Sequence, residues 1–200
     1  MTVSRALSNH PSVRKETRRA ILERARELGY VKSAAASAMR GDPTAIVGLL
    51  LPNILNEFYA RFANSLTLAC ERHGIQVITH LTNDDLEREA LALARLREVQ
   101  ADGVVMVPAP GEPAAATSRH LEEMKVVRLI RQRGNMPGAI DLLLDDRSSI
   151  ATAVGFLAKK GHRRIAYIGA HLDLSSGRDR YGAFVAGMEH NNVDLAPELV

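Results

Sequence analysis

A continuous apolar run, Ile46–Leu51, limits most tightly what this 200-residue chain can fold into. The run has the length of a strand, and an unbroken apolar strand must be covered on both faces, as in a parallel sheet. Three further strand-like segments follow it, Ile75–Leu81, Asp102–Pro108 and Val126–Ile130, and a helix-type pattern separates each strand from the next. Strands that alternate with helices predict an α/β fold with a doubly wound parallel sheet and right-handed crossovers.

The predicted helices have recognisable ends. The first runs from about Ala60 to His73-Gly74, the second is capped by Asn83-Asp84-Asp85 and reaches about Gln100, and the third covers Ala114–Met124. Ligands of such sheets bind beyond the carboxyl ends of the strands. One rim is therefore expected to hold three loops: Pro52–Tyr59, Pro108–Gly111 and Arg131–Arg133.

Residues 140–191 resemble the start of a second, similar subdomain. A strand over Ile140–Leu144 leads through Asp145-Asp146 into a helix that ends near Lys160, and Gly161–Ile165 then enters another strand. The expected division of the chain is a helical head, a linker and two ligand-binding subdomains, at residues 1–30, 31–43, 44–139 and 140–200.

The composition of the chain indicates the cellular compartment in which it works. Hydrophobic residues make up 46% of the chain, which is ample for a buried core, although aromatic residues are only 4%. No apolar run has the length of a membrane span, and no secretory signal pattern opens the chain. A single cysteine, Cys70, excludes an internal disulfide. These features predict a cytoplasmic protein without membrane association.

Positive charge is concentrated near the start. Residues 1–40 hold nine Lys or Arg and three acidic residues, a net charge of +6, whereas the whole chain is +3, so the remainder is −3. A basic head on a mildly acidic body favours contact with a polyanion. A solvated helix face explains the same charges equally well.

The head reads as two helices. Residues 2–9 form a short helix, a turn follows at Asn9-His10-Pro11, and Ser12 is a plausible N-cap of a helix through Leu28 that stops at Gly29. The next stretch, Tyr30–Pro43, is alanine-rich and carries one large apolar side chain, Met39. It has too little apolar surface to be a stable helix alone, and contact with DNA is the obvious way to complete one.

Three segments of the head resemble a known protein family. They are Thr2-Val3-Ser4-Arg5-Ala6-Leu7, Glu16-Thr17-Arg18-Arg19 and Glu27-Leu28-Gly29-Tyr30. In order and spacing they resemble the DNA-binding head of the lactose/galactose repressor family, and Gly161-His162-Arg163-Arg164-Ile165 resembles a later signature of that family. The chain starts within what would be the recognition helix, and the family's second subdomain continues past Val200, so both ends are expected to be cut.

The resemblance implies a set of DNA-binding residues. Hydroxyl groups would bind phosphate, Arg5 would reach guanine in the major groove, and hinge residues would enter the minor groove, where Met39 replaces a wedging Leu. The alternative for Met39 is a packing contact on the body. The implied residues are Thr2, Ser4, Arg5, Thr17, Ser33, Ala36, Met39 and Arg40.

It also implies an effector site. Asn56-Glu57-Phe58-Tyr59 is similar to the family's aromatic stretch, with Glu57 in place of Pro, and Arg180 matches the arginine that holds effector oxygens. A guanidinium fork suits that task. Phe58 and Tyr59 could instead be packing residues, and Arg180 could form a surface ion pair with Asp179 or Asp173. The implied effector residues are Asn53, Phe58, Tyr59, Asp145, Asp146 and Arg180.

Nothing in the chain indicates an enzyme. One Cys and seven scattered His give no metal-ligand spacing, and glycine-rich phosphate loops are missing. Ser175-Ser176-Gly177 reads as a loop without a His base. The acids Asp84-Asp85 and Asp145-Asp146 are explained by helix capping. No cofactor and no metal are therefore expected.

The predicted function is a DNA-binding transcriptional regulator of repressor type. Its operator affinity would be controlled by a small-molecule effector of the sugar type, and it would act as a homodimer, with the helix Ala60–His73 as a candidate surface. Two alternatives remain: a sugar-binding module without DNA-binding activity, and a non-functional remnant.

Overall fold

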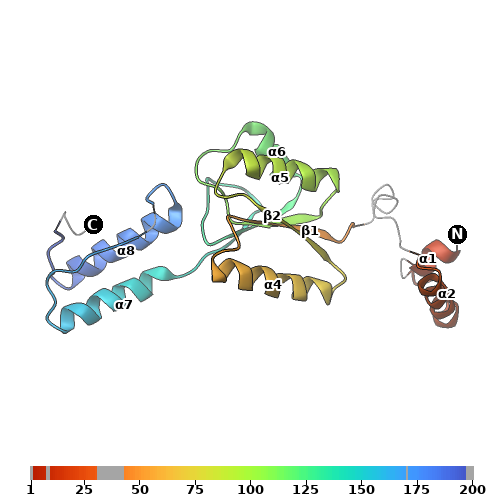
Figure 1. Cartoon of the computed structure of the whole chain (residues 1–200), viewed down its shortest axis with the longest axis horizontal. Coiled ribbons are helices and arrows are strands. Elements are labelled where there is room, and N and C mark those ends of the chain that lie inside the picture. Colours follow the sequence, from red (N-terminus) through yellow and green to blue (C-terminus); the bar gives the residue numbers. More distant parts are fainter. Residues whose placement is uncertain (1, 8–9, 31–42, 170, 197–200) are drawn as a thin grey trace. The chain divides into compact units, whose positions relative to one another are not determined.

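The computed structural model describes residues 2–7, 10–30, 43–169 and 171–196 of the chain (Figure 1). The chain divides into two compact units, Met1–Thr44 and Ala45–Val200. The predicted hinge helix falls in residues 31–42, which lie outside the described residues.

The first unit contains two helices, α1 (Thr2–Leu7) and α2 (Lys15–Glu27). Among its described residues only Ala6 and Val13 are buried, and α2 has no buried residue at all. Gly29, at φ +62°, follows the end of α2 in the left-handed conformation expected of a C′ glycine, as predicted.

The predicted N-cap of the second helix is wrong. The helix begins at Lys15 and its N-cap is Arg14, which makes no side-chain capping bond. Ser12 belongs instead to the preceding turn, where its backbone N–H donates to Nδ1 of His10 at 3.2 Å. Arg18 holds the same turn from α2, since its Nη2 donates to the carbonyl oxygen of His10 at 2.6 Å.

The second unit is built on a five-stranded, all-parallel sheet of order β2-β1-β3-β4-β5. The predicted α/β class and doubly wound order are confirmed. Ile140–Leu142 pairs with β4 and so extends this first sheet, although the sequence pattern placed the start of the second subdomain at residue 140. The strands are β1 (Ile46–Leu51), β2 (Gln76–Leu81), β3 (Gly103–Met106), β4 (Lys125–Leu129) and β5 (Ile140–Leu142).

Helices cover both faces of the sheet. Figure 1 shows α5 (Leu86–Glu98) and α6 (Ala115–Glu122) on one face and α4 (Glu57–Glu71) on the other. Strand β1 serves both cores, because Leu50 packs on the α5 side while Leu49 and Leu51 pack on the α4 side. The unbroken apolar run is thereby explained. Helix α4 starts at Glu57 rather than near Ala60, because the Asn56 side chain caps it.

Helices α7 (Asp146–Lys159) and α8 (Ser175–His190) pack on each other around a separate apolar cluster. The strand predicted after Gly161 is absent, since residues 162–169 have no strand conformation and Ile168 is 98% exposed. A strand needs a hydrogen-bonded neighbour, and the described residues supply none there. Ser175–Gly177, predicted as a loop, forms the first turn of α8. No helix within the described ranges is both long and apolar enough to cross a membrane.

The close approach of α5 to β1 gives a test of this core. Leu96 is fully buried, and a Cβ added at Gly48 would lie 2.1 Å from its Cδ1, so the two residues are in tight contact. We expect Leu96→Ala to lower the free energy of unfolding by about 2 to 5 kcal/mol, because it leaves a cavity. Urea unfolding followed by far-ultraviolet circular dichroism measures the change. Leu91→Ala on the same helix, where the side chain is 53% exposed, is the matched control and should change it by less than about 0.5 kcal/mol.

Candidate functional site

A cavity of about 370 Å³ lies in the second unit, beyond the carboxyl ends of β1 and β4. Its walls come from the loop after β1, the start of α4, the residues after β4 and the first turns of α8. The lining residues that matter here are Asn53, Phe58, Tyr59, Arg131, Ser176 and Arg180. Four of the six effector residues implied by the sequence therefore line one cavity.

The loop after β1 is shaped by two asparagines. Oδ1 of Asn53 accepts hydrogen bonds from the backbone N–H groups of Leu55 and Asn56, both at 3.1 Å. Oδ1 of Asn56 caps α4 by accepting from the N–H of Phe58 at 3.0 Å. The side-chain oxygen Oδ1 of Asn53 is thus occupied by the loop, and the side-chain NH₂ group is the part left for a ligand.

Phe58 and Tyr59 form an aromatic corner of the cavity. Their ring centroids are 5.7 Å apart with an interplanar angle of 75°, an edge-to-face pair. Phe58 remains 45% exposed, whereas Tyr59 also packs against the α4-side core. Burial raises the pKa of the Tyr59 phenol above its usual value, and the nearby positive charge of Arg131 opposes part of the rise. The hydroxyl therefore stays protonated and able to donate at neutral pH.

Arg180 is paired within the second unit. Its Nε donates to Oδ2 of Asp146 at 2.5 Å. The ion pair that the sequence offered as an alternative, with Asp179 or Asp173, is not the one formed, because Asp179 binds Arg147 at 2.9 Å. The pair with Asp146 fixes the guanidinium by one edge and leaves its Nη groups for the cavity.

Arg131 lies in a loop that the sequence placed on the ligand rim, but the sequence did not single it out as an effector residue. It is only 5% exposed, and its Nη2 forms an ion pair with Oδ1 of Asp84. Its Nε is buried and has no hydrogen-bond partner among the described residues. A buried, unpartnered donor of a charged group is costly, and Asp84 supplies the compensating negative charge beside it.

In each of the two adjacent aspartate pairs, Asp84-Asp85 and Asp145-Asp146, one residue caps a helix and the other binds an arginine. Asp85 caps α5 by accepting from the N–H of Arg88 at 2.8 Å, and Asp145 caps α7 by accepting from Ser148. Capping thus explains one acid of each pair. The other acid, Asp84 or Asp146, neutralises an arginine of the cavity. Asp145 is exposed and is not among the lining residues of the cavity.

An unusual turn at the end of β4 places Arg131. Ile130 has φ +67°, which is rare for a β-branched residue, and the N–H of Arg131 donates to the carbonyl oxygen of Leu129 at 2.6 Å. These features define a γ-turn centred on Ile130, a strained type. The N–H of Ile130 is meanwhile held by Leu142 on β5 at 2.9 Å.

A buried ion pair supports the neighbouring loops. Glu89 on α5 is fully buried, and its carboxylate accepts from Nη2 of Arg133 and from the N–H of Ala109, both at 2.6 Å. Arg133 in turn donates from Nη1 to the carbonyl oxygen of Ala109 at 2.9 Å. The peptide groups of Ala109 are held from both sides, which joins the loops after β3 and β4 to α5.

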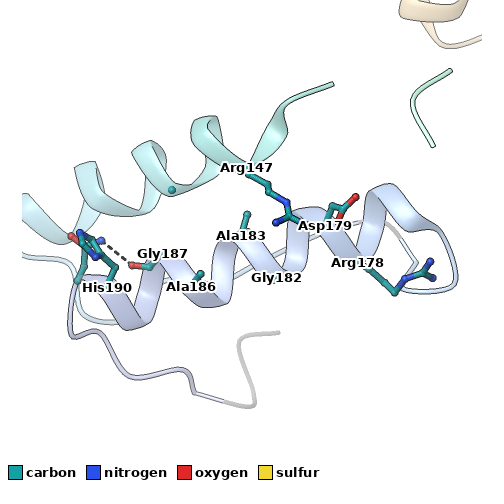
Figure 2. A pocket seen from close by; sticks show the side chains of 10 residues that line it. Arg147, Arg178, Asp179, Gly182, Ala183, Ala186, Gly187 and His190 are labelled. Carbon is teal, nitrogen blue, oxygen red and sulfur yellow. Dashed lines mark hydrogen bonds and ion pairs between the residues drawn. The ribbon is translucent and has the colours of Figure 1, made fainter. Parts of the chain in front are cut away.

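A second hollow in this unit, about 510 Å³ in volume, lies along α7 and α8. Figure 2 shows Arg147 of α7 reaching Asp179 of α8 at one end and His190 at the other. Between them the walls are small side chains, including Ala183, Ala186 and Gly187. None of the residues predicted to bind effector lines it, and the charges of Arg147 and Asp179 are already paired with each other.

The described part of the head presents its predicted DNA-binding residues on the surface. Thr2, Ser4 and Arg5 lie on α1 and Thr17 lies on α2, and all four are exposed. Helix α2 adds a basic hollow of about 300 Å³ lined by Lys15, Arg18, Arg19, Leu22, Glu23 and Arg26. Four predicted residues lie outside the described residues: Ser33, Ala36, Met39 and Arg40. Across the described ranges, no group of three or more His, Cys, Asp or Glu side chains could hold a metal ion.

A basic helical head, joined to a parallel sheet with a polar cavity at the carboxyl edge of its strands, defines a two-part regulator-type chain with a ligand-binding domain. Comparison with known families agrees. Residues 1–33 match "Bacterial regulatory proteins, lacI family", and residues 44–191 match "Periplasmic binding proteins and sugar binding domain of LacI family". The chain belongs to the LacI family.

Individual relatives are distant and longer. The HTH-type transcriptional regulator RegA of Clostridium saccharobutylicum is 26% identical over 100% of this chain and 60% of its own length. A LacI family regulator from Lactobacillus casei, solved with bound sucrose, is 28% identical with a TM-score of 0.62, over 77% of this chain and 56% of that one. The lac repressor dimer bound to operator and the anti-inducer ONPF shares the fold, with a TM-score of 0.78 at 18% identity, over 96% and 58%. The chain thus spans little more than half the length of these relatives.

The bonds from Arg133 and from the N–H of Ala109 to the buried carboxylate of Glu89, here called the Glu89 clamp, can be tested by mutation. Glu89→Ala leaves Arg133 buried without its carboxylate, so we expect a loss of about 3 to 5 kcal/mol in the free energy of unfolding. Glu89→Gln keeps an acceptor for the Ala109 N–H and should lose less. Glu98→Ala, an exposed site on the same helix, is the control for charge removal. Equal unfolding midpoints for the Glu89→Ala and Glu98→Ala variants in urea would contradict the clamp.

Proposed function

We propose that the chain acts as a DNA-binding transcriptional regulator of repressor type, whose operator affinity is controlled by a sugar-type effector bound in the 370 Å³ cavity. The observation that carries the proposal is this cavity, where an aromatic corner faces two arginines that are each neutralised by an aspartate. Support comes from RegA, a transcriptional regulator, and from the Lactobacillus casei regulator with bound sucrose.

In this proposal a sugar ring lies against Phe58 and Tyr59 while its hydroxyls bind the polar wall. The Nη groups of Arg180 grip neighbouring hydroxyl oxygens, as a planar fork can. Asp146 orients that fork, Asn53 offers its NH₂ group, and Asp145 acts only through the cap of α7. The volume falls within the range of small-molecule pockets, about 300 to 1,000 Å³.

The proposed DNA contacts lie on the head. Thr2, Ser4 and Thr17 offer hydroxyls to phosphate, which fix register, and Arg5 offers a bidentate donor to guanine. The hinge contacts of Ser33, Ala36, Met39 and Arg40 remain a hypothesis from the sequence. In that hypothesis effector binding biases whether the 33–40 segment forms a helix in the minor groove.

We further propose that the protein works as a cytoplasmic homodimer, as the lac repressor dimer does on its operator. Helix α4 is the candidate surface, since Leu68 on it is 51% exposed.

The effector arm is tested by calorimetric titration of the 200-residue chain with a panel of sugars. We expect at least one to bind, and Arg180→Ala to weaken that binding by about 10- to 100-fold, because hydrogen bonds to a charged group are lost. Arg180→Lys should also weaken it, since an ammonium cannot form the fork. Arg119→Ala removes an exposed charge on α6 outside the cavity and serves as the control. Unchanged affinity in both Arg180 variants would remove Arg180 from the site.

The DNA arm is tested by fluorescence anisotropy with short duplexes. We expect weak, poorly sequence-selective binding whose affinity falls steeply as salt rises from about 50 to 200 mM, because phosphate contacts release counterions. Arg5→Ala should weaken binding and lower the salt dependence, whereas Arg119→Ala in the other unit should not. No measurable binding to any duplex at about 50 mM salt would instead favour a sugar-binding module that does not act on DNA.

A further inference from the structure

A smaller cavity of about 210 Å³ adjoins the effector cavity. The two share Arg131 and Leu174 in their walls. The smaller cavity is bounded by the loop after β3, the loop after β4 and the residues that lead into α8. One hydrogen bond ties two of these segments together, since the N–H of Gln132 donates to Oγ of Ser175 at 3.0 Å.

The arginines of the smaller cavity are already committed. Arg133 binds Glu89 and the Ala109 carbonyl oxygen, as described above. Arg178 donates from Nη1 to the carbonyl oxygens of Leu172 and Asp173, both at 2.9 Å. Glu89 neutralises Arg133, whereas the carbonyl oxygens hold the guanidinium of Arg178 in place without neutralising its charge. The two carboxylates in the same walls, Glu112 and Asp173, outweigh that single charge.

The acidic side chains of the same walls are available. Glu112 and Asp173 are exposed, and within the described ranges neither carboxylate has a hydrogen-bond or ion-pair partner. The side-chain amide of Gln132 is available in the same way. Two carboxylates oppose a phosphate group by like charge, whereas they accept strongly from the hydroxyls of a neutral sugar.

The two cavities complement each other chemically. The larger one offers mainly donors, from the Arg180 Nη groups, the Asn53 NH₂ group and the Tyr59 hydroxyl, while the smaller one adds acceptors. A hydroxyl both donates and accepts, so a ligand rich in hydroxyls and extended over both cavities satisfies each set. Arg131, which belongs to both walls, lies where the two parts of such a ligand meet.

We infer that the smaller cavity is a subsite for the second ring of a neutral, disaccharide-sized effector, an inference that rests on the proposed function. One ring lies against Phe58 and Tyr59, and the other lies between Glu112, Gln132 and Asp173. The effector is therefore neither a single hexose nor a phosphorylated sugar.

The test is calorimetric titration of the 200-residue chain with three groups of probes. They are the disaccharides sucrose, maltose, trehalose and lactose, the hexoses glucose, fructose and galactose, and the anions fructose 1-phosphate and glucose 6-phosphate. We expect at least one disaccharide to bind tenfold or more tightly than its constituent hexoses and than either phosphate.

Variants then locate the second ring. The double variant Glu112→Ala, Asp173→Ala should weaken disaccharide binding about tenfold and leave hexose binding unchanged, because both sites are exposed and lie outside the larger cavity. Glu122→Ala, exposed on α6 and outside both cavities, is the matched control for lost acidic charge.

Three results count against the inference. Hexoses or phosphorylated sugars that bind as tightly as any disaccharide overturn it while leaving the proposed function intact. A disaccharide whose affinity is unchanged in the double variant overturns the subsite in the same way. If no probe binds, the sugar-effector proposal itself fails, and the inference fails with it.

Discussion

A buried guanidinium must have a carboxylate beside it, and this requirement organises the carboxyl edge of the sheet. Three arginines near the cavity are each paired with an acid distant in sequence: Arg131 with Asp84, Arg133 with Glu89 and Arg180 with Asp146. Arg131 and Arg133 lie in the loop after β4 and are largely buried, whereas Arg180 lies on α8 and its side chain is 36% exposed. Removing one partner of the Arg131 or Arg133 pair leaves a buried charge and costs far more than the pair contributes, so these two pairs fix the loop after β4 beside the cavity. Their mutual neutralisation also leaves a polar cavity with little net charge, which suits an uncharged ligand.

Much of the fold follows from the local sequence pattern, whereas the site follows only in part. Ile46–Leu51 had to be a doubly covered strand, and helices α5 and α7 were found because Asp85 and Asp145 cap their first turns. The pairing of Arg131 with Asp84 was not identified, since it spans 47 residues and helix capping already offered a local explanation for Asp84. The strand expected after Gly161 failed for a related reason: a strand is defined by its neighbour, which a local pattern does not contain.

Strain at the end of β4 connects the core to the site. A β-branched residue with positive φ costs of order 1 to 3 kcal/mol and persists only where its surroundings over-determine it. Ile130 is held on both sides, by the bond from its N–H to Leu142 and by the short bond from Arg131 to Leu129. The sheet core thus supplies the free energy that keeps Arg131 turned into the wall shared by the two cavities. The position of Arg131 therefore depends on the integrity of β5 as much as on Asp84.

The two units differ in how much buried apolar surface stabilises their described residues. The ligand-binding unit has apolar clusters on both sides of its sheet, but the described head buries only Ala6 and Val13, while Leu28 and Tyr30 remain more than half exposed. Two buried side chains contribute roughly 1.5 to 3 kcal/mol each at most, which is small against the entropy of ordering two helices. The order of such a head is set largely by what it contacts. Under the proposed function a coupling of about 1 to 3 kcal/mol from the effector site is then comparable with the stability of the head itself, and suffices to change its occupancy on DNA.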